Sequence, residues 1–264
     1  MPERQLKTLL DAAVAAAEAA APVIRGYFGS KEQGLERKAD GSPVTRADRE
    51  AEAIIRERLV LSDSGEPIDI LGEEEGFAGM GTRWRWTIDP IDGTRAFVRG
   101  IPLFGSMIGL EDTASGQALL GVIHLPVLGV TYAGAAGLGA TRNGEPIRLP
   151  DAVALDDAII GTGDVAQFEE AGRLDDYRRL IDLHGFVRGY TDCFGHGLTI
   201  EGALGAMLDP ALNPWDIVPT RALIEAAGGS ALVAPSQAEG KFDALFGNRA
   251  LVARLARELG LATR

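Results

Sequence analysis

The sequence is poor in cysteine and histidine and contains no long apolar run. Its 264 residues include one cysteine, Cys193, which excludes a disulfide within the chain and a zinc site built from several cysteines. The three histidines, His124, His184 and His196, share no metal-ligand spacing. No stretch reaches the roughly 20 apolar residues of a membrane span. The alanine-rich start carries acidic residues and does not resemble a signal peptide, so we expect a cytoplasmic protein.

Positive charge is also scarce. Lysine and arginine together number 26 against 38 acidic residues, and the formal net charge is −12. Binding to nucleic acid or to an anionic membrane needs a basic surface, so both partners are disfavoured. An anionic substrate held through a metal ion is still compatible with this charge, because clustered carboxylates need cations.

Hydrophobic periodicity predicts the elements of the N-terminal part. A helix is expected over residues 3–27, and a second from Thr45 to about Leu61, with Asp48 completing a capping box. The polar segment 29–43 contains three glycines and predicts a loop or a short hairpin. Apolar segments predict strands at 68–71, 83–89, 103–112, 118–126 and 129–137, followed by an Asn-Gly hairpin turn at 143–144. Helices packed against a largely antiparallel sheet are expected.

The pattern changes near residue 149. Strands are predicted at 158–164 and 230–235, and helices at 165–185, 213–229 and 250–260, with a strand, turn and helix across 186–207. Alternating strands and helices are typical of a layered α/β structure. We therefore predict an α+β domain over residues 1–149 and an α/β domain over residues 150–264.

The segment TIDPIDGTRAF places Asp89 and Asp92 on either side of Pro90. The proline disfavours helical geometry at Asp89, so this aspartate is expected to end a strand. The backbone N–H groups of Gly93 and Thr94 would then open a turn or helix and could bind an anion. Carboxylates suit a hard cation such as magnesium. The segment thus predicts metal-assisted phosphate chemistry, the alternative being a capped turn beside a solvated strand end.

Two further acids lie beside predicted element ends. Glu73 follows a strand and a glycine and begins a run of three glutamates, which either form a solvated loop or share a cation. Asp216 falls in the first turn of a helix with Asn213 as its cap and Pro214 as its first residue. An acid there also favours the helix dipole, which by itself explains Asp216 more simply.

Three segments in one order resemble the inositol monophosphatase family, whose members are magnesium-dependent, lithium-sensitive phosphatases. They are GEE at 72–74, WTIDPIDGTRAFVRGIPLFGSMIGL at 86–110 and NPWDIVPTRALIEAAGG at 213–229. The resemblance covers most of the chain. It implies an α/β fold with an α+β N-terminal part, arranged as the layered αβαβα sandwich of the inositol monophosphatase and sugar phosphatase type. It also implies a homodimer that hydrolyses a small phosphate ester.

The resemblance further implies a role for each matching residue. Two or three magnesium ions would be bound by Glu73, Asp89, Asp92, Asp216 and the backbone carbonyl of Ile91. The phosphate would lie on the amides of Gly93 and Thr94. The catalytic residues would be Asp48, Thr94 and Glu73, with Asp48 and Thr94 orienting and activating the attacking water. Asp48 lies in TRAD, which matches the family's TxxD.

The substrate is predicted from smaller differences. The segment Arg95-Ala96-Phe97 replaces the asparagine-containing version typical of inositol enzymes, and RGYTDCFGHGL is similar to the GGDCYxYxL segment of the histidinol-phosphatase branch. Asp192 would then face an ammonium or imidazole group, and Arg95 and Asp209 would complete the substrate site. L-Histidinol phosphate is the expected substrate, with inositol 1-phosphate or a range of sugar phosphates as the alternative.

The chain also departs from that branch. Thr191 replaces a glycine, Phe194 and His196 stand for the expected aromatic residues, and Asp209 stands where a glutamate is frequent. Asp192 as a helix cap and Asp209 as a turn residue are open alternatives.

A function of another class rests on Gly161, Gly163 and Ala166, which match the spacing of a dinucleotide-binding turn. Its acidic partner about 20 residues later is missing from a strand end, because Asp182 falls inside a predicted helix. No G-x-S-x-G segment supports a serine hydrolase. A binding protein without activity is disfavoured, because all the expected metal-binding residues are present.

Overall fold

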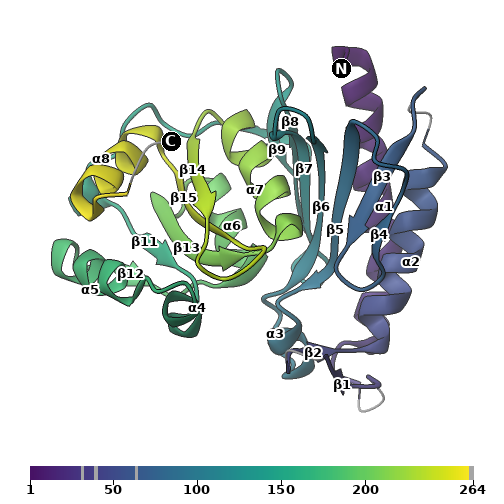
Figure 1. The fold of residues 1–264 in the computed structure, drawn as a ribbon, viewed down its shortest axis with the longest axis horizontal. Helices are drawn as coiled ribbons and strands as arrows, with labels where there is room; N and C mark the ends of the chain where they lie inside the picture. Colours follow the sequence, from purple (N-terminus) through teal and green to yellow (C-terminus); the bar gives the residue numbers. More distant parts are fainter. Residues whose placement is uncertain (31–32, 39–40, 63–64, 262–264) are drawn as a thin grey trace.

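The computed structural model describes residues 1–30, 33–38, 41–62 and 65–261. Its elements stack in alternating layers (Figure 1): a helix pair, a large sheet, a second helix pair, a smaller sheet and a last helical layer. The outer pair is α1 (Glu3–Tyr27) and α2 (Arg46–Val60), the central pair is α6 (Asp192–Ile200) and α7 (Pro214–Ala226), and the last layer is α4 (Val165–Glu170), α5 (Leu174–Leu183) and α8 (Arg249–Leu259). The predicted αβαβα sandwich is confirmed.

The larger sheet has eight strands in the order β10-β9-β8-β7-β6-β5-β3-β4. They are β3 (Ile68–Gly72), β4 (Gly76–Ala78), β5 (Trp84–Asp92), β6 (Gly105–Asp112), β7 (Gln117–Leu125), β8 (Val130–Ala135), β9 (Gly139–Arg142) and β10 (Glu145–Ile147). Every neighbouring pair is antiparallel except β3 and β5. Asn143 and Gly144 connect β9 and β10 with φ angles of 51° and 81°, the left-handed geometry that the Asn-Gly pair predicts.

The smaller sheet has five strands in the order β12-β11-β13-β15-β14. They are β11 (Ile160–Thr162), β12 (Val187–Arg188), β13 (Ala206–Leu212), β14 (Ser230–Pro235) and β15 (Phe242–Gly247). The sequence did not predict β13 or β15. Pro210 lowers the strand preference of β13, and the structure accommodates it where the pairing with β15 shifts register between Asp209 and Leu212.

The predicted helix over 165–185 is wrong in one respect, because it is two helices. Gly172 has a φ of 66° and separates α4 from α5. A left-handed glycine ends a helix at little steric cost, which the apolar periodicity on both sides concealed.

The N-terminal segments agree with the sequence. The apolar face of α1 packs with α2 against the larger sheet, where the main core lies. Thr45 caps α2 in a capping box with Asp48. Within segment 29–43, strand β1 (Glu36–Arg37) pairs with β2 (Pro43–Val44), which gives the expected short hairpin, while 31–32 and 39–40 lie outside the described residues. No helix among the described residues has the length and apolar character to cross a membrane.

Helix α7 lies between the two sheets and approaches the larger one closely. Gly109 of β6 and Gly121 of β7 are paired across the strands. A Cβ on Gly109 would lie 2.9 Å from Pro219 Cδ of α7, and one on Gly121 would overlap the carbonyl of Pro219. The two glycines therefore allow the helix to rest on the backbone of the sheet.

Candidate active site

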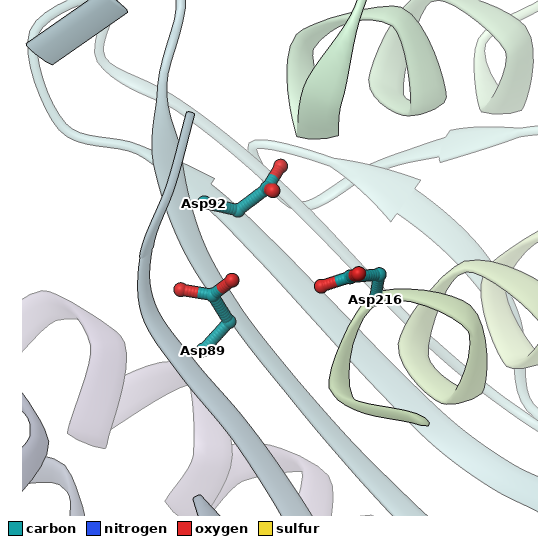
Figure 2. Close-up of side chains that lie close together, drawn as sticks. All are labelled: Asp89, Asp92 and Asp216. Carbon is teal, nitrogen blue, oxygen red and sulfur yellow. The ribbon is translucent and has the colours of Figure 1, made fainter. Parts of the chain in front are cut away.

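Three carboxylates from two distant parts of the chain meet between the end of β5 and the start of α7 (Figure 2). Asp89, Asp92 and Asp216 each offer one oxygen, and these oxygens lie within 4.8 Å of one another. Asp89 and Asp216 are buried, and Asp92 is half-buried. The structure thus brings together three of the residues that the resemblance assigned to the metal.

A bulge at the end of β5 places two of these carboxylates on one side of the strand. Asp89 pairs with Met107 and Asp92 with Gly105, so β5 has one residue more than β6 over this interval. Residues three apart in a regular strand point to opposite faces, and the extra residue cancels that alternation. The backbone N–H of Ile91 donates to Asp89 Oδ1 at 2.9 Å. The prediction that Asp89 ends the strand is therefore wrong, because β5 continues to Asp92.

Asp216 is held by one oxygen and presents the other. The backbone N–H of Asn213 donates to Asp216 Oδ2 at 2.8 Å, and the Asn213 side-chain amide lies 3.2 Å from the same oxygen. Oδ1 is buried and has no hydrogen-bond partner among the described residues. A buried carboxylate oxygen without a partner is costly unless it meets a proton or a cation. This orphaned oxygen fits a metal ligand.

The protonation of these acids leads to the same conclusion. Burial, and then the charge of Glu73, raise the pKa of Asp216 to about 7. Burial raises the pKa of Asp89 and of Asp92 well above the ordinary value, and the neighbouring charges of Glu73 and Asp192 respectively raise it further. Without a counterion, the carboxylates can be ionised together only at a large electrostatic cost. The group can hold a hard divalent cation, which prefers oxygen ligands.

Glu73 lies beside this group and contacts a lysine that the sequence did not single out. Lys38 Nζ is 2.6 Å from Glu73 Oε1 and 2.7 Å from Glu74 Oε1. Burial alone would lower the pKa of Lys38, but the two carboxylates outweigh it and raise the pKa. Only spatial proximity reveals Lys38, because it precedes Glu73 by 35 residues.

Thr94 and Asp48 lie next to each other, as expected of a pair that acts on water. Thr94 begins the short helix α3 (Thr94–Val98), and its Oγ1 lies 2.9 Å from the carbonyl oxygen of Ile91 and 3.4 Å from Asp48 Oδ1. The other oxygen of Asp48 accepts from the N–H and hydroxyl of Thr45 at 2.7 and 2.6 Å. Burial raises the pKa of Asp48 to about 6, so this carboxylate can exchange a proton near neutral pH.

The turn before α3 is built for an anion. Gly93 has a φ of 84°, and a Cβ there would lie 3.0 Å from the carbonyl oxygen of Leu103. The first hydrogen bond into α3 runs from Phe97 N–H to the carbonyl of Gly93. The earlier N–H groups of the helix have no partner within it and can donate to a phosphoryl oxygen.

The three residues predicted to bind substrate lie in different environments. Asp192 begins α6 with a φ of 58°, accepts a hydrogen bond from the Thr191 hydroxyl at 3.0 Å, and raises the pKa of Asp92 by its charge. Arg95 is exposed on α3. Asp209 is 1% exposed inside β13, so the alternative of a turn residue is wrong.

The glycines of the dinucleotide-like segment have a packing role. A Cβ on Gly161 would lie 2.9 Å from Leu204 Cδ1, and one on Gly163 would overlap the Asp209 carboxylate. The N–H of Gly163 donates to the carbonyl of Leu208 at 3.2 Å. The Gly163 N–H, which a bound dinucleotide phosphate would need, is therefore already hydrogen-bonded to β13 of the smaller sheet.

Comparisons with known proteins identify the family. The sequence profile of the inositol monophosphatase family matches residues 5–259. The chain belongs to this family. It is 38% identical over 224 residues to a histidinol-phosphatase of Chlorobaculum parvum, covering 83% of each chain. It is 30% identical to a fructose-1,6-bisphosphatase/inositol-1-monophosphatase of Aquifex aeolicus, covering 93% of each chain.

Solved structures of the family agree with the fold. An inositol monophosphatase from Anabaena (Nostoc) superposes with a TM-score of 0.81 at 30% identity, covering 97% of this chain and 96% of the other. Membership of the inositol monophosphatase family confirms the prediction of an enzyme that hydrolyses phosphoric monoesters. These relatives are named for different substrates.

Proposed function

We propose that this chain is a magnesium-dependent phosphomonoesterase that converts L-histidinol phosphate to L-histidinol. The observation that carries the metal-dependent reaction is the meeting of Asp89, Asp92 and the unpartnered Asp216 oxygen. The N-terminal N–H groups of α3, which have no partner within the helix, follow directly after Asp92 and Gly93. The substrate is supported by the carboxylate of Asp192 next to this group and by the similarity to a histidinol-phosphatase.

Backbone amides would bind the phosphate, and the Thr94 and Asp48 side chains would act on the attacking water. The amides of Gly93 and Thr94 would hold phosphoryl oxygens and neutralise part of their charge. The hydroxyl oxygen of Thr94 would accept a hydrogen bond from the attacking water while Asp48 accepts the hydroxyl proton, an arrangement that the 3.4 Å contact already approaches.

Magnesium would be held by the three aspartates, with Glu73 and the carbonyl of Ile91 as further ligands, in two or three ions per site. Such ions neutralise phosphate charge and lower the pKa of a bound water. The fit of the site rests on the unpartnered Oδ1 of Asp216 and on the raised pKa values of the aspartates. Lys38 would have to leave Glu73 Oε1, which it contacts at 2.6 Å, before that oxygen could bind an ion.

Asp192 supports a cationic substrate over a neutral polyol. An ammonium or imidazolium group can neutralise the Asp192 charge, which otherwise repels Asp92. Inositol offers only hydroxyl groups to the same position. Arg95, exposed on α3, is proposed to contact the outer part of the substrate.

The experiment is phosphate release from L-histidinol phosphate and from myo-inositol 1-phosphate, measured side by side with magnesium. We expect kcat/KM to favour histidinol phosphate, and the preference to fall in Asp192→Asn. Asp92→Asn is the inactive control. A preference for inositol phosphate that Asp192→Asn leaves unchanged would exclude the proposed substrate but keep the phosphatase. Release no faster than in Asp92→Asn from either compound would exclude both.

Three further expectations remain proposals: a homodimer, a cytoplasmic location and two domains, 1–149 and 150–264. The larger sheet lies within the first part and the smaller sheet within the second, while α7 of the second part packs against both. Light scattering on the purified protein distinguishes a dimer from a monomer.

A further inference from the structure

A series of buried hydrogen bonds connects β13, α6 and α7. His196 Nε2 lies 3.0 Å from Asp209 Oδ2, and His196 Nδ1 lies 2.7 Å from Thr220 Oγ1. The Thr220 hydroxyl donates to the backbone carbonyl of Asp216 at 2.7 Å. The three linking residues, His196, Asp209 and Thr220, are at most 1% exposed. Water therefore cannot replace any of these contacts easily.

The hydrogen-bond partners fix where the protons are. The carbonyl of Asp216 can only accept, so the single Thr220 proton lies on that contact. The contact between Thr220 and His196 then needs a proton on Nδ1, donated to the hydroxyl oxygen. One further proton lies between Nε2 and Asp209, on either partner. In both arrangements the His196–Asp209 pair is neutral as a whole, so Asp209 adds no net charge to the substrate side.

The ring of His196 is also fixed by its neighbours. A Cβ on Gly195 would overlap the carbonyl oxygen of Tyr190, and one on Gly197 would overlap the ring of Tyr132. The imidazole and the Phe246 ring form a T-shaped pair, with ring centroids 5.0 Å apart. The glycines on both sides of His196 therefore allow α6 to pack closely against Tyr190 and Tyr132. The two hydrogen bonds and the contact with Phe246 then fix the orientation of the imidazole.

This chain of contacts connects the metal-binding aspartates. Asp92 accepts a hydrogen bond from the backbone N–H of Cys193, in the first turn of α6. One turn later on the same helix, His196 reaches the carbonyl of Asp216 through Thr220. Helix α6 therefore contacts Asp92 directly and Asp216 indirectly.

We propose that His196, anchored by Asp209 and acting through Thr220, is a positioning residue that sets the metal affinity of the site. Asp209 then acts by orienting His196 and not by touching the substrate. The inference rests on the proposed magnesium site and adds to it a dependence on residues that touch neither metal nor phosphate. Groups that orient metal ligands commonly change metal affinity by about 10–100-fold when removed.

The test uses an isosteric change, Thr220→Val, which removes the hydroxyl. Thr220→Ser restores the hydroxyl and serves as the rescue. Thr199→Val is the matched control, because Thr199 is also fully buried and bonds the carbonyl four residues earlier, at 2.8 Å, but has no histidine partner. Magnesium binding to each protein without substrate is measured by titration calorimetry, and folding is checked by thermal melting.

We expect Thr220→Val to weaken magnesium binding about 10-fold or more, and Thr220→Ser and Thr199→Val to stay within about 2-fold of the unaltered protein. A slowly exchanging His196 Nδ1 proton should be visible by NMR in the unaltered protein and lost in Thr220→Val. Should the valine variant not fold, Thr220→Ala carries the same expectation. Equal magnesium affinities in Thr220→Val and Thr199→Val would overturn the inference while the proposed site stands. An unaltered protein that binds no magnesium would overturn both.

Discussion

Lys38 stands between two glutamates at the edge of the site, with its Nζ 2.6 Å from Glu73 and 2.7 Å from Glu74. Its side chain is 22% exposed and that of Glu74 only 6%. Burial raises the pKa of Glu74 to about 7 even though the hydrogen bond from Lys38 lowers it. The β1–β2 hairpin thus supplies a cation to acids that otherwise face one another.

Replacing that cation should destabilise the metal-free protein. In the presence of a chelator, Lys38→Met is expected to lower the free energy of unfolding by about 1–3 kcal/mol, because partly buried carboxylates lose their partner. Urea denaturation measures the change. Lys7→Met is the control, since the Lys7–Asp11 pair is 64% exposed on both sides and should contribute less than about 1 kcal/mol. Equal losses in the two variants would contradict the role of Lys38.

Asp48 should matter for the rate more than for the fold. Asp48→Asn keeps an oxygen that can accept from the Thr45 N–H but removes the group that takes up a proton. We expect kcat to fall by about 10²–10⁴-fold with little change in magnesium affinity. Asp69→Asn alters another buried acid, which accepts from the N–H groups of Met80 and Thr82, and should leave kcat within about 2-fold. Steady-state kinetics at saturating magnesium measure kcat for the two variants. An equal kcat in Asp48→Asn and Asp69→Asn would contradict the role of Asp48.

Alanine substitutions of the glycines before and after α3 distinguish the effect of backbone strain from the effect of steric crowding. Gly93→Ala meets both, with a φ of 84° and the carbonyl oxygen of Leu103 at 3.0 Å from the new Cβ. It should cost about 1–3 kcal/mol and reduce phosphate release at least 10-fold. Gly100→Ala has a φ of 73° but open space around its Cβ, so it should cost about 1 kcal/mol and leave activity unchanged. Similar activity in the two variants would refute a close fit at Gly93.

His124, on β7, should make the stability of the protein depend on pH. Burial, and then the charge of Arg25, lower the pKa of His124 to about 4 from 6.5. A lowered pKa means that the stabilisation is complete above pH 6.5 and is lost as the pH falls towards 4. The loss amounts to about 3 kcal/mol. Urea denaturation at several pH values should therefore show a shallower dependence for His124→Asn than for the unaltered protein. Parallel curves would show that His124 does not titrate in this way.

The sequence predicted those elements whose signal is local. The capping box of Thr45 and Asp48 and the turn at Asn143 and Gly144 depend only on neighbouring residues, and both were correct. Strand β13 depends instead on its neighbours in the smaller sheet, because Pro210 and a register shift weaken its own pattern. Long-range pairing decides such strands.

The same distinction applies to the site. Asp89 and Asp92 were predicted from their own segment and Asp216 from the resemblance to the family, and the structure brings the three together. The contacts of Lys38 and His196 were missed, since they join segments far apart in the chain. The histidines were tested for metal-ligand spacing, a criterion that does not detect a histidine bonded to an aspartate and a threonine.

The close approach of Pro219 to Gly109 and Gly121 has a mechanical consequence. Gly121 lies against the backbone of Pro219, and Gly109 lies against the ring of Pro219 and a methyl group of Val218. None of these groups is long and flexible, so we expect α7 to move with β6 and β7. Asp216 moves with the helix, whereas Asp89 moves with β5, the next strand of the same sheet. The distance between these two carboxylates is thus coupled to the geometry of β5, β6 and β7, through the close approach of α7 to Gly109 and Gly121.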